Sequence, residues 1–144
     1  MVRNRHAVGL TLLELLVAII IVAILVTVGL STYRRMMERA YRRQAWDLLL
    51  TMYSGERAYF LVNDVYRANP AGMAQWREIH MDDPNLAGIP VTFTVTAAGA
   101  PGPTATFEAK ATRTAGPCSG NIMTVDQDRL RGGDWGTCGA IGPF

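Results

Sequence analysis

The chain of 144 residues has few of the residue types on which most catalytic and metal sites depend. It has two histidines, His6 and His80, and no Ser, Cys or Asp side chain placed beside a candidate base that would activate it. Its two cysteines have no histidine or further cysteine nearby with which to build a zinc site. We therefore expect no enzymatic activity, no cofactor and no bound metal.

Charge is scarce near the N-terminus, where Glu14 is the one formal charge between Arg5 and Arg34. The 19 residues from Leu15 to Tyr33 contain no ionisable group except the terminal tyrosine. At about 1.5 Å per residue, a helix of this run spans a hydrocarbon core of roughly 30 Å. Because a carboxylate inside lipid costs on the order of 3 kcal/mol, we expect Glu14 to have a partner.

Proline is absent before Pro70, so nothing interrupts a helix predicted from Leu10 to about Leu61. This helix is apolar all round as far as Leu30 and amphipathic afterwards. The apolar positions of its second half are Met37, Tyr41, Ala45, Leu48, Met52 and Tyr59. A helix of about 52 residues extends roughly 78 Å, so half of it must lie in lipid or against other chains. Gly55 is its expected weak point.

The pattern changes after the long helix. Residues 62–90 are punctuated by proline and predict a loop region with one short helix around residues 71–79. Alternating residues over 91–96 and 105–111, separated by a turn at 99–103, predict a hairpin with one apolar face, and 122–126 a third strand. We expect an α+β fold in which the long helix packs against three or four antiparallel strands, followed by a C-terminal loop bounded by a disulfide.

The disulfide is an interpretation of Cys118 and Cys138, which lie in a loop-rich tail behind a membrane anchor. Closing this loop outside the cytoplasm would stabilise the fold by roughly 3 kcal/mol. The alternative is a pair of free, buried thiols in a reducing compartment.

Basic charge is concentrated directly after the apolar run. Residues 34–43 carry a net charge of +4, whereas the chain from Gln44 onward carries −3. The basic residues are Arg34, Arg35, Arg39, Arg42 and Arg43. We interpret them as a solvated or lipid-headgroup collar that meets acidic side chains of neighbouring subunits. Contact with nucleic acid phosphates is the alternative.

Three aspartates near the C-terminus, Asp126, Asp128 and Asp134, raise the question of calcium. Their spacing fails the EF-hand pattern, because Leu130 and Arg131 occupy positions that need an oxygen ligand and a glycine. We expect these carboxylates to hold turns.

The N-terminal sequence Gly9-Leu10-Thr11-Leu12-Leu13-Glu14-Leu15-Leu16-Val17 resembles the processing site of type IV pilins and pseudopilins. In that family a short basic leader ends in glycine, and a glutamate stands fifth in the cleaved product. A looser similarity to minor, pilin-E-like subunits covers Ala45, Leu49, Glu56, Arg57, Tyr59, Asn63, Tyr66, Cys118, residues 123–128 and Cys138. The chain departs from the family at Leu10, where phenylalanine is usual, and at Ser31, where proline is common.

The resemblance implies a leader of residues 1–9, an assembly helix of 10–33 and a globular domain of 34–144. An aspartyl prepilin peptidase would cut between Gly9 and Leu10 and methylate the new Leu10 amine. Glu14 would then attract the Leu10 amine of a neighbouring subunit within the membrane. As an alternative that can coexist, Thr11 and Glu14 form a capping box at the helix start.

The function implied is that of a structural subunit of a type IV pilus, with other pilin subunits, the peptidase and the inner-membrane assembly machinery as partners. The precursor would sit in the inner membrane with its C-terminal domain outside the cytoplasm, and the mature subunit in an extracellular filament. Such filaments serve adhesion, twitching motility or DNA uptake, and a pseudopilin of type II secretion is an alternative within the family.

The distribution of charge around the span supports an alternative function of another class. Five arginines follow the span and two, Arg3 and Arg5, precede it, so the positive-inside rule favours a cytosolic C-terminal domain. That arrangement would describe a non-polymerising anchored protein. Ordinary secretory cleavage after Thr27-Val28-Gly29 is a third, weaker reading, because the apolar run exceeds a typical signal-peptide core.

Overall fold

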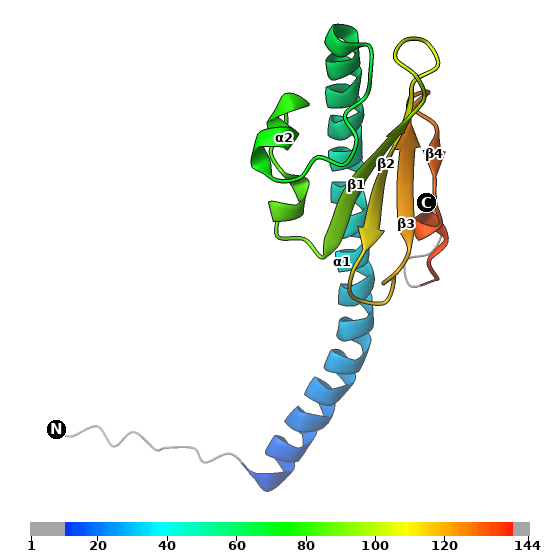
Figure 1. Ribbon diagram of the computed structural model, residues 1–144. Helices are drawn as coiled ribbons and strands as arrows, with labels where there is room; N and C mark the ends of the chain where they lie inside the picture. Colours follow the sequence, from blue (N-terminus) through cyan, green and yellow to red (C-terminus); the bar gives the residue numbers. More distant parts are fainter. Residues whose placement is uncertain (1–10, 140–144) are drawn as a thin grey trace, which may run out of the picture. The chain divides into compact units, whose positions relative to one another are not determined.

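The computed structural model describes residues 11–139 and confirms the α+β fold (Figure 1). Its elements in chain order are α1 (Leu12–Asn63), α2 (Met73–Glu78), the short 3-10 helix η1 (Pro84–Leu86), β1 (Val91–Ala98), β2 (Thr106–Arg113), β3 (Ile122–Asp126), β4 (Arg131–Gly132) and the 3-10 helix η2 (Trp135–Thr137). The predicted hairpin, third strand and short helix are all present. The two-residue strand β4 completes a four-stranded sheet.

The chain divides into two compact units, one ending at Arg34 and the other beginning at Arg35. In the first unit every described side chain is exposed. The second unit contains the rest of α1, the sheet, both short 3-10 helices and α2, and it holds all buried residues of the described chain.

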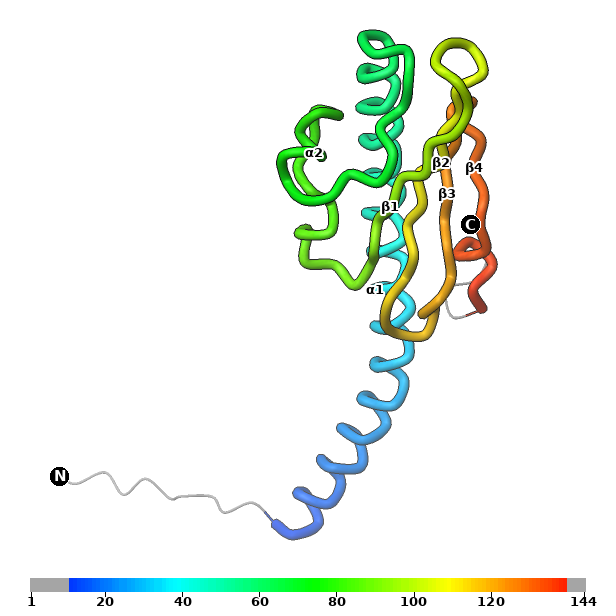
Figure 2. Tube along the Cα trace, viewed as in Figure 1, coloured from blue at the N-terminus to red at the C-terminus, as the bar shows by residue number. Residues whose placement is uncertain are grey.

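The four strands are antiparallel and follow one another in the order β1-β2-β3-β4, as the tube drawing shows (Figure 2). Phe93 pairs with Ala111, which pairs in turn with Met123, so that these three side chains share one face. All three are buried, at 2% exposure or less. The alternation in the sequence therefore identified the inner face of the sheet correctly, and this face packs with α1 residues such as Leu49 in one core.

The buried face of α1 overlaps the predicted one, since Ala45 and Met52 are fully buried and Tyr41, Leu48 and Tyr59 pack against the core, but its centre is displaced. The buried positions are Glu38, Arg42, Ala45, Leu49, Met52, Gly55 and Glu56. Met37, Tyr41, Leu48 and Tyr59, predicted to face the core, are only half-buried. Hydrophobicity did not locate the centre of the face because ionic side chains occupy several of its positions, and each of these makes at least one polar contact described below.

Gly55 lies where α1 closely approaches the residue that follows α2. A Cβ at this position would collide with the carbonyl oxygen of Ile79. Ile79 directly follows α2, and both Ile79 and Trp76 of α2 are buried in the core. The glycine expected to weaken the helix is therefore the residue that lets the α2 segment pack beside α1 (Figure 1).

The outer edge of β1 is covered by a side chain rather than by another strand. The Asn85 carboxamide accepts a hydrogen bond from Phe93 N at 2.7 Å and donates one to Phe93 O at 3.3 Å. Asn69 N adds a hydrogen bond to Val95 O at 2.8 Å. These bonds satisfy backbone groups of an edge strand, which are otherwise open to pairing with a strand of another chain.

Candidate functional site

The helix start contains the two described residues of the predicted assembly site. Thr11 precedes α1, and its Oγ1 accepts a hydrogen bond from Glu14 N at 3.2 Å. This is the threonine half of the predicted capping box. The Glu14 side chain is exposed and lies on the same side of the helix as Leu15, Ala18 and Val22. The predicted cleavage and methylation positions, Gly9 and Leu10, lie outside the described residues.

An exposed apolar surface extends from Leu12 to Leu30, on both sides of Glu14 in the sequence. The exposed fraction of its large side chains ranges from 46% at Val17 to 83% at Leu12. This part of α1 is long and apolar enough to cross a membrane. Ser31 does not interrupt the helix, and its hydroxyl donates to Val28 O at 3.0 Å within the preceding turn. Water is an unfavourable solvent for a surface of this kind, so lipid or other apolar helices must cover it.

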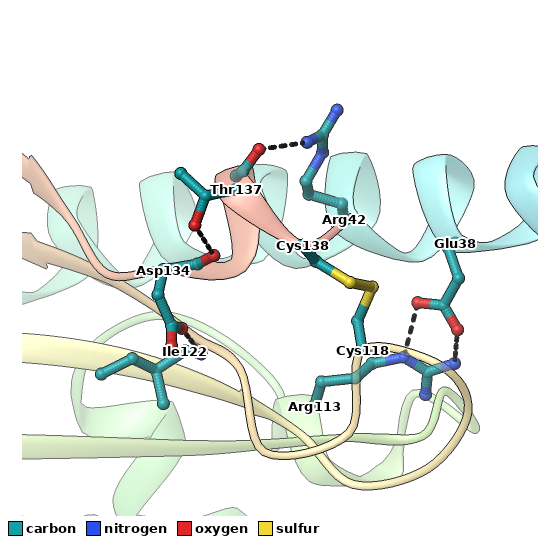
Figure 3. The surroundings of a disulfide bond; sticks show 9 residues. Glu38, Arg42, Arg113, Cys118, Ile122, Asp134, Thr137 and Cys138 are labelled. Carbon is teal, nitrogen blue, oxygen red and sulfur yellow. Dashed lines mark hydrogen bonds and ion pairs between the residues drawn. A yellow bond between two sulfur atoms is a disulfide. The ribbon is translucent and has the colours of Figure 1, made fainter. Parts of the chain in front are cut away.

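The C-terminal loop is closed by the predicted disulfide between Cys118 and Cys138 (Figure 3). Cys118 is fully buried, and Trp135, also fully buried, lies in η2 just before Cys138. The bond therefore ties the segment after β2 to the end of the described chain.

A buried ion pair lies next to the disulfide (Figure 3). Arg113 at the end of β2 donates from Nε to Glu38 Oε2 at 3.0 Å and from Nη2 to Glu38 Oε1 at 2.7 Å. Its Nη1 donates to Pro90 O at 2.7 Å, and its guanidinium lies 4.5 Å from the centre of the Tyr41 ring. Both charged side chains are 3% exposed. This bidentate pair joins α1 to the sheet.

The arginine stripe is not a uniform collar. Arg34, Arg35, Arg39 and Arg43 are exposed as predicted, but Arg42 is 5% exposed. It donates to Gly136 O at 3.4 Å, a contact that anchors η2 against α1 (Figure 3). Burial lowers the pKa of Arg42, and the nearby charges of Arg131 and Arg39 act in the same direction.

Arg131 and Trp46 complete a pocket beside this stripe. The Arg131 guanidinium lies 4.7 Å from the Trp46 ring centre. The pocket, about 250 Å³ in volume, is lined by Arg39, Arg42, Arg43, Trp46 and Arg131. Trp46 is thus half-buried, whereas Trp76 is a core residue.

Glu56 is a second buried acid on α1 and has no exposed surface. Its Oε2 accepts a hydrogen bond from Arg67 N at 2.7 Å, while its Oε1 has no hydrogen-bond partner in the described part of the chain. Burial raises the pKa of Glu56 to about 7, although the hydrogen bond and the charge of Arg67 oppose this shift.

Of the C-terminal aspartates, Asp126 holds a turn, as predicted, whereas Asp134 binds a backbone N–H 12 residues away in the sequence. Asp126 Oδ1 accepts hydrogen bonds from Asp128 N at 3.0 Å and Leu130 N at 2.8 Å. Asp134 Oδ1 accepts one from Ile122 N at 2.7 Å, and this bond lowers the pKa of Asp134. These contacts fix the connection between β3 and η2.

His80 stands on the surface in the turn after α2. It lines an open groove of about 540 Å³. The remaining residues of the groove are Leu48, Thr51, Met73, Met81, Asp82, Asp83, Pro84, Leu86 and Ala87.

No family model, curated protein or solved structure matches this chain. The pilin resemblance therefore depends on the residues of the chain itself.

The sequence patterns did not indicate three polar contacts of buried side chains: Glu38 with Arg113, Arg42 with Gly136, and Glu56 with Arg67 N. A signal was present for two of them. Arg113 continues the inward alternation of β2, and Glu56 continues the buried spacing of Leu49 and Met52 on α1. A charged residue on an inner face calls for a polar partner.

Proposed function

We propose that this protein is a type IV pilin-like subunit that is cut after Gly9 and polymerises through the N-terminal part of α1. The observation that carries the proposal is the exposed apolar surface from Leu12 to Leu30, headed by a single carboxylate. A membrane anchor alone needs the apolar run but gains nothing from Glu14. A subunit that leaves the membrane to join a helical bundle needs both.

The role proposed for Glu14 follows from charge. Cleavage before Leu10 would create an α-amine with an ordinary pKa near 8, which is cationic at neutral pH. In a bundle of apolar helices, an amine of one copy and the Glu14 carboxylate of the next would neutralise each other. This pairing removes the cost of an isolated carboxylate and favours one stagger between copies. The Thr11 cap leaves it possible, because it uses the Glu14 backbone N–H and not the carboxylate.

The globular part of the chain suits a filament surface. Its core is closed by the sheet, the disulfide and the Glu38–Arg113 pair without help from the apolar segment. The proposed location is the inner membrane for the precursor and an extracellular filament for the mature subunit. The disulfide favours this topology over an anchored protein with a cytosolic domain, where thiols are kept reduced.

The test is a Glu14→Ala variant expressed in the native host. We expect normal cleavage and normal amounts in the membrane, but loss from sheared filaments. Asp47→Ala, which removes an exposed acid from the same helix beyond the apolar segment, is the matched control and should be incorporated normally. Normal incorporation of Glu14→Ala would remove the proposed pairing.

DNA binding through the arginine stripe is a second candidate, supported by the exposed Arg39 and Arg43 beside Trp46. The structure weakens it in one respect, because buried Arg42 contacts Gly136. Salt-dependent DNA binding by the purified protein, lost in an Arg43→Ala variant, would support this role.

A further inference from the structure

The segment that follows α1 is held to the helix through Glu56. Its Oε2 accepts the Arg67 backbone N–H, and neighbouring Tyr66 is buried between the Phe60 and Phe107 rings, with centroid distances of 4.7 and 4.6 Å. The loop that follows α1 is therefore bound to the buried Glu56 carboxylate at Arg67, four residues after the helix ends.

Arg67 links this carboxylate to α2. Its Nε lies 2.9 Å from Oε2 of Glu78, the last residue of α2. The approach lacks hydrogen-bond alignment, since Arg67 Nε is buried and makes no hydrogen bond among the described residues. Glu56 Oε1 is likewise buried without a donor. Arg67 Nε is thus a donor without an acceptor, and Glu56 Oε1 is an acceptor without a donor. The two residues are already joined by the hydrogen bond from Arg67 N to Glu56 Oε2.

We propose that Glu56 and Arg67 form a proton-controlled latch, in which loss of the Glu56 proton to solvent draws the Arg67 guanidinium from Glu78 to Glu56 and loosens α2. With Glu56 neutral, Arg67 stays with Glu78 and helps to hold α2. With Glu56 ionised, the buried carboxylate needs a cation far more than Glu78 does, because Glu78 is 43% exposed and solvated by water. The pKa of about 7 places this exchange in a physiological range.

The other charged groups around Glu56 do not provide such an exchange. Arg57, its neighbour on α1, is engaged with the Tyr66 hydroxyl at 3.3 Å. Among the described charged groups, Arg67 is the one whose charge acts on Glu56. From the sheet, the uncharged Phe107 ring packs against Tyr66, the residue before Arg67. His80 is exposed and lies in the groove beside Leu48 and Thr51.

The latch would act on a surface. Met73 of α2 and the turn after it form one wall of the groove of about 540 Å³, and α1 forms the other through Leu48 and Thr51. Loosening α2 increases the mobility of the groove wall that contains Met73. The device therefore makes an exposed surface of the globular unit pH-sensitive, whether or not the chain polymerises.

The test uses full-length, ¹⁵N-labelled protein in detergent micelles. The Arg67 amide resonance should titrate with a midpoint near the Glu56 pKa of about 7. The amides of Ile79, His80 and Met81 are bonded to α2 carbonyls. Their exchange protection, corrected for intrinsic rates, should fall roughly two- to fivefold between about pH 5.5 and pH 8.5. Amides of the β2–β3 ladder serve as the internal reference.

Two variants separate the latch from other titrations. Glu56→Gln cannot ionise at this position, so the Arg67 amide should stop titrating and α2 protection should become independent of pH. Glu78→Gln removes the exposed partner, so α2 should show the lower protection at every pH. The proposal is overturned if the Arg67 amide does not titrate, if Glu56→Gln retains the pH dependence of α2, or if Glu78→Gln retains it.

Discussion

Glu38 on α1 and Arg113 at the end of β2 are 75 residues apart in the sequence and form a bidentate ion pair with both side chains 3% exposed. Gly116 makes this possible, because a Cβ there would collide with Glu38 Oε1 and meet Arg113 Nη2 at 2.9 Å. The pair is further enclosed by Tyr41 and Pro90. It connects the long helix to the sheet through two hydrogen bonds between charged groups.

Removing one partner of this pair should be costly. We expect Arg113→Met to lower the free energy of unfolding by about 3–5 kcal/mol, since Glu38 is then buried without its counter-ion. Urea titration of the detergent-solubilised protein measures the change. The double variant Glu38→Leu with Arg113→Met should recover most of the loss, and a double variant as unstable as the single one would contradict this explanation.

The stability of the fold should decrease as the pH rises through neutrality. Glu56 has a folded-state pKa of about 7 against an unfolded value of 4.5, so the folded protein binds the proton more tightly. Its contribution is therefore fully present below about pH 4.5 and is lost by the time the pH passes about 7, a change of about 3 kcal/mol.

Glu56→Gln isolates this contribution. The variant should lose that part of the pH dependence and be more stable than the parent protein at about pH 8.5. Paired urea titrations at acidic and alkaline pH measure both effects. Equal pH dependence in parent and variant would rule out Glu56 as its source.

Gly55 and Gly29 offer a matched pair of substitutions on one helix. Gly55→Ala places a methyl group against the Ile79 carbonyl and should destabilise the globular unit by about 1–3 kcal/mol. Gly29→Ala meets nothing within 4 Å and should leave the unfolding midpoint of that unit unchanged. If both variants behave alike, close packing at Gly55 is not the reason for the glycine.

Opening the disulfide should free the end of the chain. Cys118 and Cys138 lie 20 residues apart, and a loop of this size is worth roughly 3 kcal/mol in the chain-entropy view. The double variant Cys118→Ser with Cys138→Ser should therefore unfold at lower urea. Reductant should change the parent protein in the same way and the variant not at all.

Local patterns predicted most of the fold. The alternation around Phe93 and Phe107 is a property of each strand, so the hairpin was predictable, and the absence of proline made the long helix predictable. Strand β4 was not predictable, because two residues are too few to show an alternating pattern. The inner face of α1 was predicted only in part, because Glu38 and Arg42 are buried with partners 75 and 94 residues away, which no local pattern specifies.

The candidate assembly site was predictable from the sequence in one part only. Glu14 was identified because one acid heads an apolar run, which is visible in the sequence alone. Its proposed partner belongs to another copy of the chain. Burial within one molecule therefore says nothing about the pairing, and only the processed, assembled protein can report it.

The most direct measurement is the mass of the N-terminal peptide of this protein taken from filaments sheared off its native host. The account predicts a chain that begins at Leu10 with a methylated amine, present in the filament fraction. A chain that still begins at Met1, or that is absent from filaments while abundant in the membrane, would contradict it.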